Sequence, residues 1–271
     1  MKKILICLLS LFLIAGCSDN ADNNDKPKPS QKTTIEQQEI YNDKGIIITA
    51  VEFIDKGGIK FTIENTTDKA LTVSSDFIID NCNVLDNLYA EVPAQSKKNE
   101  TVTFSSLEKY TGDKTIQQIE MYFRIFDSST FEDFLTQQYY LIKTSNFGEI
   151  TNGNLLDGQI IYEDDQIKVV QKGVDTNSLW GIECSLVIIN KTDHDVVVTC
   201  GSSKINDYSI DGTLYSSLKP QKMSYESLTF YASELEENDI TDIQNITLSF
   251  HITNLNTFDY IDTDYVNIVL E

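Results

Sequence analysis

Cysteine thiols are the side chains with the clearest chemistry in this chain, and Cys17 is the first of them. Lys2 and Lys3 precede a mainly apolar run over residues 4–13, and the small residues Ala15 and Gly16 lead into Cys17. A positive segment, an apolar run and small residues, in that order, are typical of a secretory signal. The run is too short to span a bilayer as a mature helix, which needs about 20 apolar residues. The sequence therefore predicts export, with cleavage beside a cysteine sulfur.

The ending Ile14-Ala15-Gly16-Cys17 resembles the lipobox of bacterial lipoproteins. The resemblance implies that the Cys17 sulfur receives diacylglycerol. It also implies that cleavage removes residues 1–16 and leaves Cys17 as the first residue of the mature chain. An ordinary cleaved signal peptide with a chance cysteine is the alternative. Because two acyl chains hold a protein on a membrane stably, we expect a lipid anchor on the extracytoplasmic face of the cell membrane.

The sequence contains no strong pattern of catalytic or metal-binding residues. His194 and His251 are the two histidines, and neither stands in a recognisable triad or zinc-binding spacing. The chain contains no Gly-x-Ser-x-Gly, no Gly-rich phosphate loop and no His-Glu-x-x-His. Acidic clusters at 163–165 and 234–239 indicate solvated faces, with calcium binding as the alternative. We predict no enzyme, no metal and no cofactor.

Charge narrows the class of partner. The chain has 21 basic and 42 acidic residues, and losing Lys2 and Lys3 with the signal would lower the formal charge from −21 to −23. Such a surface repels phosphate backbones, which argues against nucleic-acid binding. Residues 18–38 hold almost nothing that could be buried, so we predict that residues 17–38 form a lipidated, disordered stalk.

The remaining residues repeat one pattern. Segment 64–69 matches 189–194 at an offset of 125 residues, and 119–125 matches 246–252 at 127. A slowly drifting offset over about 100 residues indicates a duplicated domain with small insertions. We predict domains at 39–145 and 159–271, joined by a linker at 146–158 with some freedom of movement.

Each copy is predicted to be built from strands. Ile59, Phe61 and Ile63 alternate with polar residues before a turn at Asn65, and the second copy repeats this up to Asn190. Period-two alternation marks half-buried strands. About seven strands per copy predict an all-β fold of two antiparallel β-sandwiches, with a short helical turn expected only within 234–242.

The repeated order of elements resembles the immunoglobulin-like domains on surface lipoproteins of Gram-positive bacteria. The resemblance is carried by the Asn-x-[Ser/Thr] turns at Asn65 and Asn190 and by the later alternating strands around Phe123 and Phe250. It implies tandem immunoglobulin-like sandwiches and no particular activity, because such folds host many functions.

Two further cysteines change together between the copies. Cys184 takes the inward place of Ile59, and Cys200 takes that of Ser75. Export permits a disulfide between Cys184 and Cys200, and two buried thiols acting as small apolar residues are the alternative. Cys82 has no equivalent and is predicted to be a partly buried free thiol.

Aromatic residues recur in the loop between two late strands of each copy. Phe131 and Phe134 lie there in the first copy, and Phe258 and Tyr260 in the second. Phe131 and Phe258 could fold back and plug the end of the sandwich. Alternatively, the four aromatics form a contact surface, because aromatics are enriched at interface cores.

The expected function is a non-catalytic binding, adhesion or envelope-assembly module that meets an unidentified protein or glycan. The main alternative is an accessory ligand-binding lipoprotein of a transporter or sensor system. A pocket of about 300 Å³ or more between the copies, lined by aromatics and a few polar groups, would favour that alternative. A wall-active hydrolase is the least favoured reading.

Overall fold

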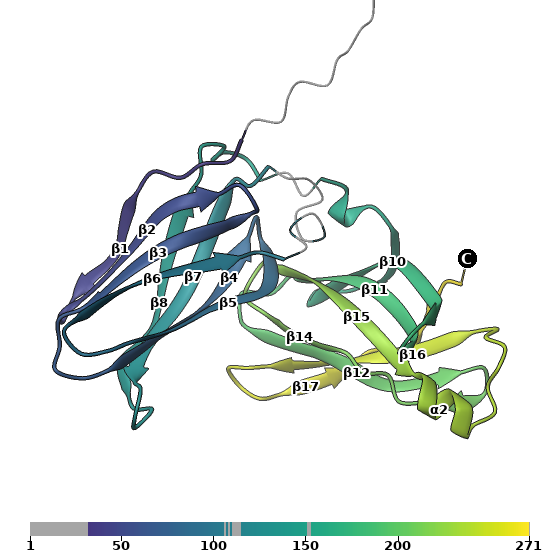
Figure 1. Ribbon diagram of the computed structural model, residues 1–271. Helices are drawn as coiled ribbons and strands as arrows, with labels where there is room; N and C mark the ends of the chain where they lie inside the picture. The colour runs from purple at the N-terminus through teal and green to yellow at the C-terminus, as the bar shows by residue number, and fades with distance from the viewer. Residues whose placement is uncertain (1–31, 106, 108, 110–114, 151–152, 271) are drawn as a thin grey trace, which may run out of the picture. The chain divides into compact units, whose positions relative to one another are not determined.

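The computed structural model describes residues 32–105, 107, 109, 115–150 and 153–270 (Figure 1). They belong to one compact unit. Cys17 and the predicted signal lie outside the described residues, so the anchor remains a prediction.

The described part of the first copy contains eight strands, in keeping with the alternation of its sequence. These are β1 (Gln38–Asp43), β2 (Ile46–Ile54), β3 (Gly58–Asn65), β4 (Leu71–Ile79), β5 (Cys82–Val92), β6 (Ser96–Thr103), β7 (Gln118–Asp127) and β8 (Asp133–Lys143).

The described part of the second copy consists of strands, one 3-10 turn (η1) and one short α-helix (α2). Its elements are η1 (Gly153–Leu156), β9 (Gln159–Glu163), β10 (Ile167–Ser178), β11 (Gly181–Asn190), β12 (Val196–Ile205), β13 (Tyr208–Ser209), β14 (Tyr215–Leu218), β15 (Met223–Tyr231), α2 (Ala232–Glu237), β16 (Ile246–Asn254), β17 (Tyr260–Asp262) and β18 (Val266–Ile268). The predicted all-β sandwich fold is confirmed, and α2 begins two residues before the helical turn expected there.

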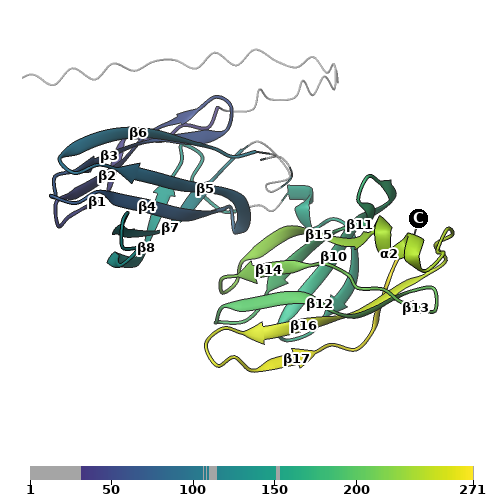
Figure 2. The same cartoon turned by 60° about the horizontal axis from the view of Figure 1, so that its bottom comes forward.

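The strands form three sheets. β1-β2-β3-β6 make a four-stranded sheet, and β8-β7-β4-β5-β15-β11-β10-β9 make an eight-stranded one. The third sheet has the order β13-β12-β16-β17, with β14 on β12 and β18 on β16 (Figure 2). The eight-stranded sheet therefore contains four strands from each copy.

Two hydrophobic cores lie within these sheets. Phe61, Phe77 and Phe104 are fully buried in the first, with Phe77 against both other rings at centroid distances of 6.1 and 5.4 Å. Phe230 and Phe250 are fully buried in the second. Because the first core also contains Val170, Val187 and Met223, side chains from the second copy help to close it.

The repeated Asn-x-Thr motif is a structural staple. The Asn65 side chain is fully buried and donates from Nδ2 to the carbonyls of Lys69, Val92 and Pro93, and its Oδ1 accepts from the backbone and hydroxyl of Thr67. The second copy repeats all five bonds around Asn190: the carbonyl acceptors are those of His194, Leu218 and Lys219, and the donors are in Thr192. A buried amide with every group satisfied holds two turns together.

The two copies are joined by a short parallel ladder between β5 and β15. Cys82 pairs with Met223, and Asn83 pairs with Ser224. Just before this ladder, Lys222 Nζ lies 2.5 Å from Glu120 Oε1, and the two side chains are 16% and 4% exposed. Breaking a buried ion pair by removing one partner costs about 3–5 kcal/mol, so this contact ties β7 firmly to the start of β15.

The predicted linker and the end of the predicted stalk pack more closely than their sequence indicates. Leu155 is buried in the first core, and Lys172 Nζ donates to carbonyls of η1, including that of Asn154 at 2.7 Å. Thr33 is buried, and the Thr34 amide donates to Ser145 Oγ at 3.0 Å. Thr33, Thr34 and Leu155 therefore make specific contacts, whereas the freedom of the linker and the disorder of the stalk stay predictions. Single apolar and hydroxyl side chains suffice to anchor a segment whose average composition is polar.

Candidate functional site

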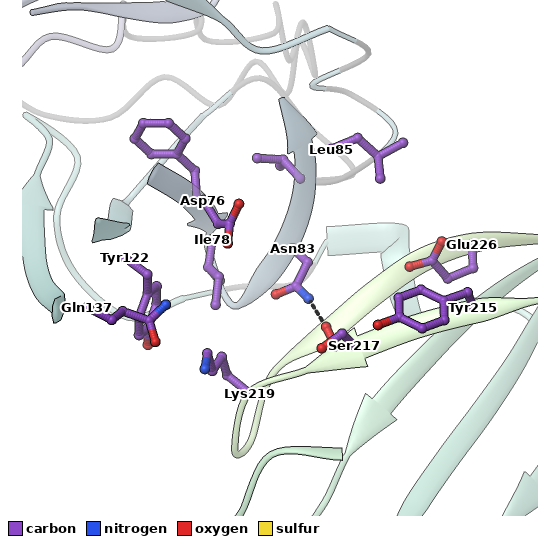
Figure 3. Close-up of a pocket in the computed structure, with 12 residues that line it drawn as sticks. Asp76, Ile78, Asn83, Leu85, Tyr122, Gln137, Tyr215, Ser217, Lys219 and Glu226 are labelled. Carbon is purple, nitrogen blue, oxygen red and sulfur yellow. Dashed lines mark hydrogen bonds between the residues drawn. The ribbon is translucent and has the colours of Figure 1, made fainter. Parts of the chain in front are cut away.

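A cleft with mixed polar and aromatic lining has a volume of about 330 Å³ and takes residues from both copies (Figure 3). β5 and β15 pair over two residues only, beyond which β5 continues along β4 and β15 along β11. The cleft lies where the two strands part. Its wall and floor are formed by Asp76, Phe77, Ile78, Asn83, Val84, Leu85, Tyr122, Gln137, Tyr215, Ser217, Lys219 and Glu226.

The Asn83 side chain makes a hydrogen bond to the other copy, and its second polar atom has no hydrogen-bond partner among the described residues. Its Nδ2 donates to the backbone carbonyl of Ser217 at 2.7 Å (Figure 3). Its Oδ1 is buried, and no atom of the described residues donates a hydrogen bond to it. Buried amide oxygens nearly always have a partner, so this acceptor marks a place for a donor from outside the chain.

Acidic groups dominate the charge of the cleft. Asp76 is an exposed residue of β4, and Glu226 comes from β15 on the other side of the cleft (Figure 3). Burial raises the pKa of Glu226 above its ordinary value, although hydrogen bonds from Ser224 and Ser216 and the charge of Lys109 act in the opposite direction. Burial therefore outweighs the groups that stabilise the charged carboxylate.

The lysine in the cleft is already engaged. Lys219 Nζ lies 2.6 Å from Asp195 Oδ2 and 5.5 Å from the centre of the Tyr122 ring. Burial, followed by the Glu120 carboxylate, raises the pKa of Tyr122 above the usual tyrosine range. The Tyr122 hydroxyl therefore stays protonated and donates to Glu120 Oε2 at 3.2 Å. Tyr122 and Tyr215 supply the aromatic surface of the cleft.

A second hollow of about 310 Å³ adjoins this cleft and shares Asp76, Tyr122 and Gln137 with it. Its remaining lining includes Ser74 and Arg124. The shared residues extend the accessible surface along β4 and β7.

The predicted contact loops have the same backbone in both copies. Phe131 and Phe258 both adopt φ of +61°, in the left-handed region. The Phe131 amide donates to the Asp127 carbonyl at 2.9 Å, and the Phe258 amide donates to the Asn254 carbonyl at 2.8 Å. Side-chain oxygens of Asp127 and Asn254 cap the following amides in both loops.

The rings of these loops point to solvent. Phe131 is 69% exposed and Phe258 is 75% exposed, so neither plugs the end of a sandwich. Phe131 stacks on the edge of the core at Phe126, with ring centroids 6.0 Å apart. Because both rings are mostly exposed, the plug interpretation is wrong for both residues.

The two other predicted contact aromatics differ from each other. Phe134 is half-buried and packs against the first core. Tyr260 is exposed, and its ring lies 4.6 Å from that of His251. Among the four predicted residues, Phe131, Phe258 and Tyr260 thus present exposed rings.

The possible disulfide between Cys184 and Cys200 is not present in the structure, where both thiols are free, Cys184 buried and Cys200 half-buried. Cys184 lies on β11 of the eight-stranded sheet and Cys200 on β12 of the third sheet. Burial raises the pKa of Cys184 to about 12, and it raises the pKa of Cys200 as well. Burial, with the nearby Glu226, also raises the pKa of Cys82 to about 12. Such thiols are poor nucleophiles at neutral pH.

Each histidine has an aspartate beside it. His194 Nδ1 lies 3.1 Å from Asp193, and His251 Nδ1 lies 2.7 Å from Asp262 Oδ1. Ser249 shares an open hollow with His251, but its Oγ accepts from the Ser202 amide. In the described part of the chain no hydrogen bond joins a serine to either imidazole, and no group of three acids, cysteines or histidines could hold a metal.

Sequence reasoning missed the cleft and one exposed loop tip. The cleft joins residues about 140 positions apart, and no spacing in the sequence signals that. Leu179 and Trp180, at the β10–β11 turn, are exposed, and the single tryptophan of the chain could have drawn attention to this tip. No helix within the described ranges is long and apolar enough to cross a bilayer.

No protein-family model matches the chain, and no curated protein matches its sequence. Its structure is similar to that of the YadV chaperone, with a TM-score of 0.27 and 11% identity over 83% of this chain and 100% of that one. It is also similar to the exo-chitosanase CsxA of Amycolatopsis orientalis (TM-score 0.25, 14% identity, 77% of this chain and 25% of that one). A third similar structure is the Salmonella enterica SafA pilin in complex with the SafB chaperone (TM-score 0.25, 9% identity, 85% and 98%). At such scores these similarities support no conclusion about function.

Proposed function

We propose that this chain is a lipid-anchored extracytoplasmic protein that binds a protein or glycan at the cell envelope without catalysing a reaction. The signal pattern that ends at Cys17 supports the anchor. The duplicated β-sandwich, which resembles immunoglobulin-like domains, supports a binding module.

The observation that carries the proposal is the pair of exposed phenylalanines in left-handed backbone. For an L-residue this conformation costs roughly 1–2 kcal/mol, and glycine or asparagine is the usual choice there. Phe131 and Phe258 occupy it at equivalent places in both copies, and their rings face solvent. Both copies have a strained backbone conformation at a phenylalanine whose ring is mostly exposed. Because burial of the ring does not offset this strain, the exposed ring itself is indicated as the functional group.

A contact role fits the chemistry of these tips. A rigid aromatic ring supplies a large contact area with few rotatable bonds, and this is why aromatics are concentrated at interface cores. Tyr260 adds a third exposed ring beside Phe258 on the same hairpin. We therefore assign the partner contact to the β7–β8 and β16–β17 hairpin tips.

The test compares binding of the intact protein to purified cell envelopes with that of the variant carrying Phe131→Gly and Phe258→Gly. We expect the double variant to lose at least tenfold in affinity and to keep its thermal unfolding temperature. Tyr208→Ser is the control, because it removes a similarly exposed ring from β13. Envelope binding unchanged by the double variant would contradict the proposal.

A second candidate function is favoured by the cleft. With a volume of about 330 Å³, two tyrosines and an unsatisfied amide oxygen, it fits the description of a small-ligand site. This supports an accessory ligand-binding protein of a transporter or sensor system. The two functions use different surfaces and can coexist.

A further inference from the structure

We propose that the cleft beside Asn83 binds a small organic cation that carries a protonated amine. The inference rests on the second candidate function above and specifies the chemistry of its ligand. Three observations on the lining residues carry it.

The unsatisfied Asn83 oxygen sets the first requirement. Because its Nδ2 is bound to the Ser217 carbonyl, the amide orientation is fixed, and Oδ1 is left as a buried acceptor with no donor among the described residues. An ammonium group offers three N–H donors, and a hydroxyl offers one. A ligand without donors would leave this acceptor buried and unpaired.

The balance of charge sets the second requirement. Within the described part of the chain no hydrogen bond or ion pair engages the Asp76 carboxylate. Glu226 faces the same cleft. Lys219 is paired with Asp195, and the buried Lys222 is paired with Glu120. Arg124 in the adjoining hollow lies 4.0 Å from Asp133. The charge of Lys109 acts on Glu226, so Asp76 is the carboxylate of the lining that has no cationic partner among the described residues. The uncompensated charge of the lining is therefore negative, which favours a cation and opposes an anion.

Aromatic surface sets the third requirement. Tyr215 is exposed on the β14 side of the cleft, and Tyr122 lies on the opposite side (Figure 3). Aromatic faces attract organic cations by about 0.5–2 kcal/mol, and they cover the methylene groups of an alkylamine equally well. At about 330 Å³ the site admits a molecule of modest size.

The experiment is isothermal titration calorimetry of the full chain in detergent with putrescine as the probe. 1,4-Butanediol is the neutral control of similar length, and succinate is the anionic control. We expect putrescine to bind and both controls to give no heat. Asp76→Asn and Glu226→Gln should each weaken putrescine binding about tenfold, whereas Glu91→Gln, an exposed carboxylate on β5 outside the cleft, should not.

Several outcomes would overturn the inference. Equal binding of 1,4-butanediol would show a site for hydroxylated neutral ligands, which leaves the ligand-binding function standing. Putrescine binding that persists in both Asp76→Asn and Glu226→Gln would place the cation elsewhere on the acidic surface. The absence of heat with all three probes at millimolar concentration would remove the amine site, and envelope binding through Phe131 and Phe258 would be tested separately.

Discussion

Replacing Phe258 by glycine tests whether its ring serves a contact with a partner or the stability of the fold. The structure gives the expected change in the free energy of unfolding. A phenylalanine ring that is 75% exposed keeps about a quarter of its area from water. With about 200 Å² for a whole side chain and about 25 cal/mol per Å², losing that quarter costs about 1.2 kcal/mol. Glycine also makes the unfolded chain more flexible, which costs about 0.4–1 kcal/mol more.

Relief of backbone strain acts in the opposite direction. Phe258 has φ of +61°, and glycine adopts this conformation without the roughly 1–2 kcal/mol that an L-residue loses there. The contributions nearly cancel, so the free energy of unfolding should change by less than about 1 kcal/mol. Phe250→Ala is the matched control, because Phe250 is fully buried on the preceding strand and its truncation should cost about 3–5 kcal/mol.

Equilibrium unfolding in urea at pH 7, followed by far-UV circular dichroism, measures both variants. A loss of more than about 2 kcal/mol for Phe258→Gly, approaching that of the buried control, would refute the reasoning. It would mean that the ring packs as part of the core in solution. The same measurement on Phe131→Gly should agree, because the two loops share their backbone geometry and hydrogen bonds.

Three further predictions concern other parts of the chain. Asn65→Ala should lower the free energy of unfolding by about 3 kcal/mol, because it leaves several buried groups unpaired; a loss below about 1 kcal/mol in urea unfolding would show that the staple is dispensable. Glu226→Gln should stabilise the protein at pH 7 and have little effect near pH 4. The folded-state pKa of Glu226 is raised, so its contribution to stability is present below the unfolded pKa and is lost as the pH rises through the folded pKa. A stability difference between wild type and variant that does not grow with pH would contradict this sign. Cys17→Ser should move the protein from the membrane fraction to the soluble fraction. Unchanged fractionation on immunoblots would contradict the proposed lipid anchor at Cys17.

Local patterns in the sequence predict much of the fold. The alternation of Ile59, Phe61 and Ile63 identifies β3, because side chains of a strand face opposite sides in turn. The Asn65 and Asn190 motifs mark equivalent turns, since the same short segment makes the same bonds in each copy. These features depend on residues that are close in sequence.

Contacts between distant segments are not predictable in this way. The β5–β15 ladder uses backbone groups, which every residue has, so the side chains of Cys82 and Met223 carry no signal for it. The cleft follows from that ladder and was missed for the same reason. Phe131 adopts a positive φ, a conformation that its residue type argues against, so the sequence contains no signal for the shape of this loop.

The eight-stranded sheet also bears on the risk of aggregation. An unpaired edge strand is a template for other chains, and duplicating a sandwich doubles the number of such edges. Joining β5 to β15 satisfies part of one edge from each copy with the other. If this ladder opens, for instance after substitution of Lys222, the unpaired backbone groups of both β5 and β15 become available to other chains. The ladder is therefore a safeguard against self-association.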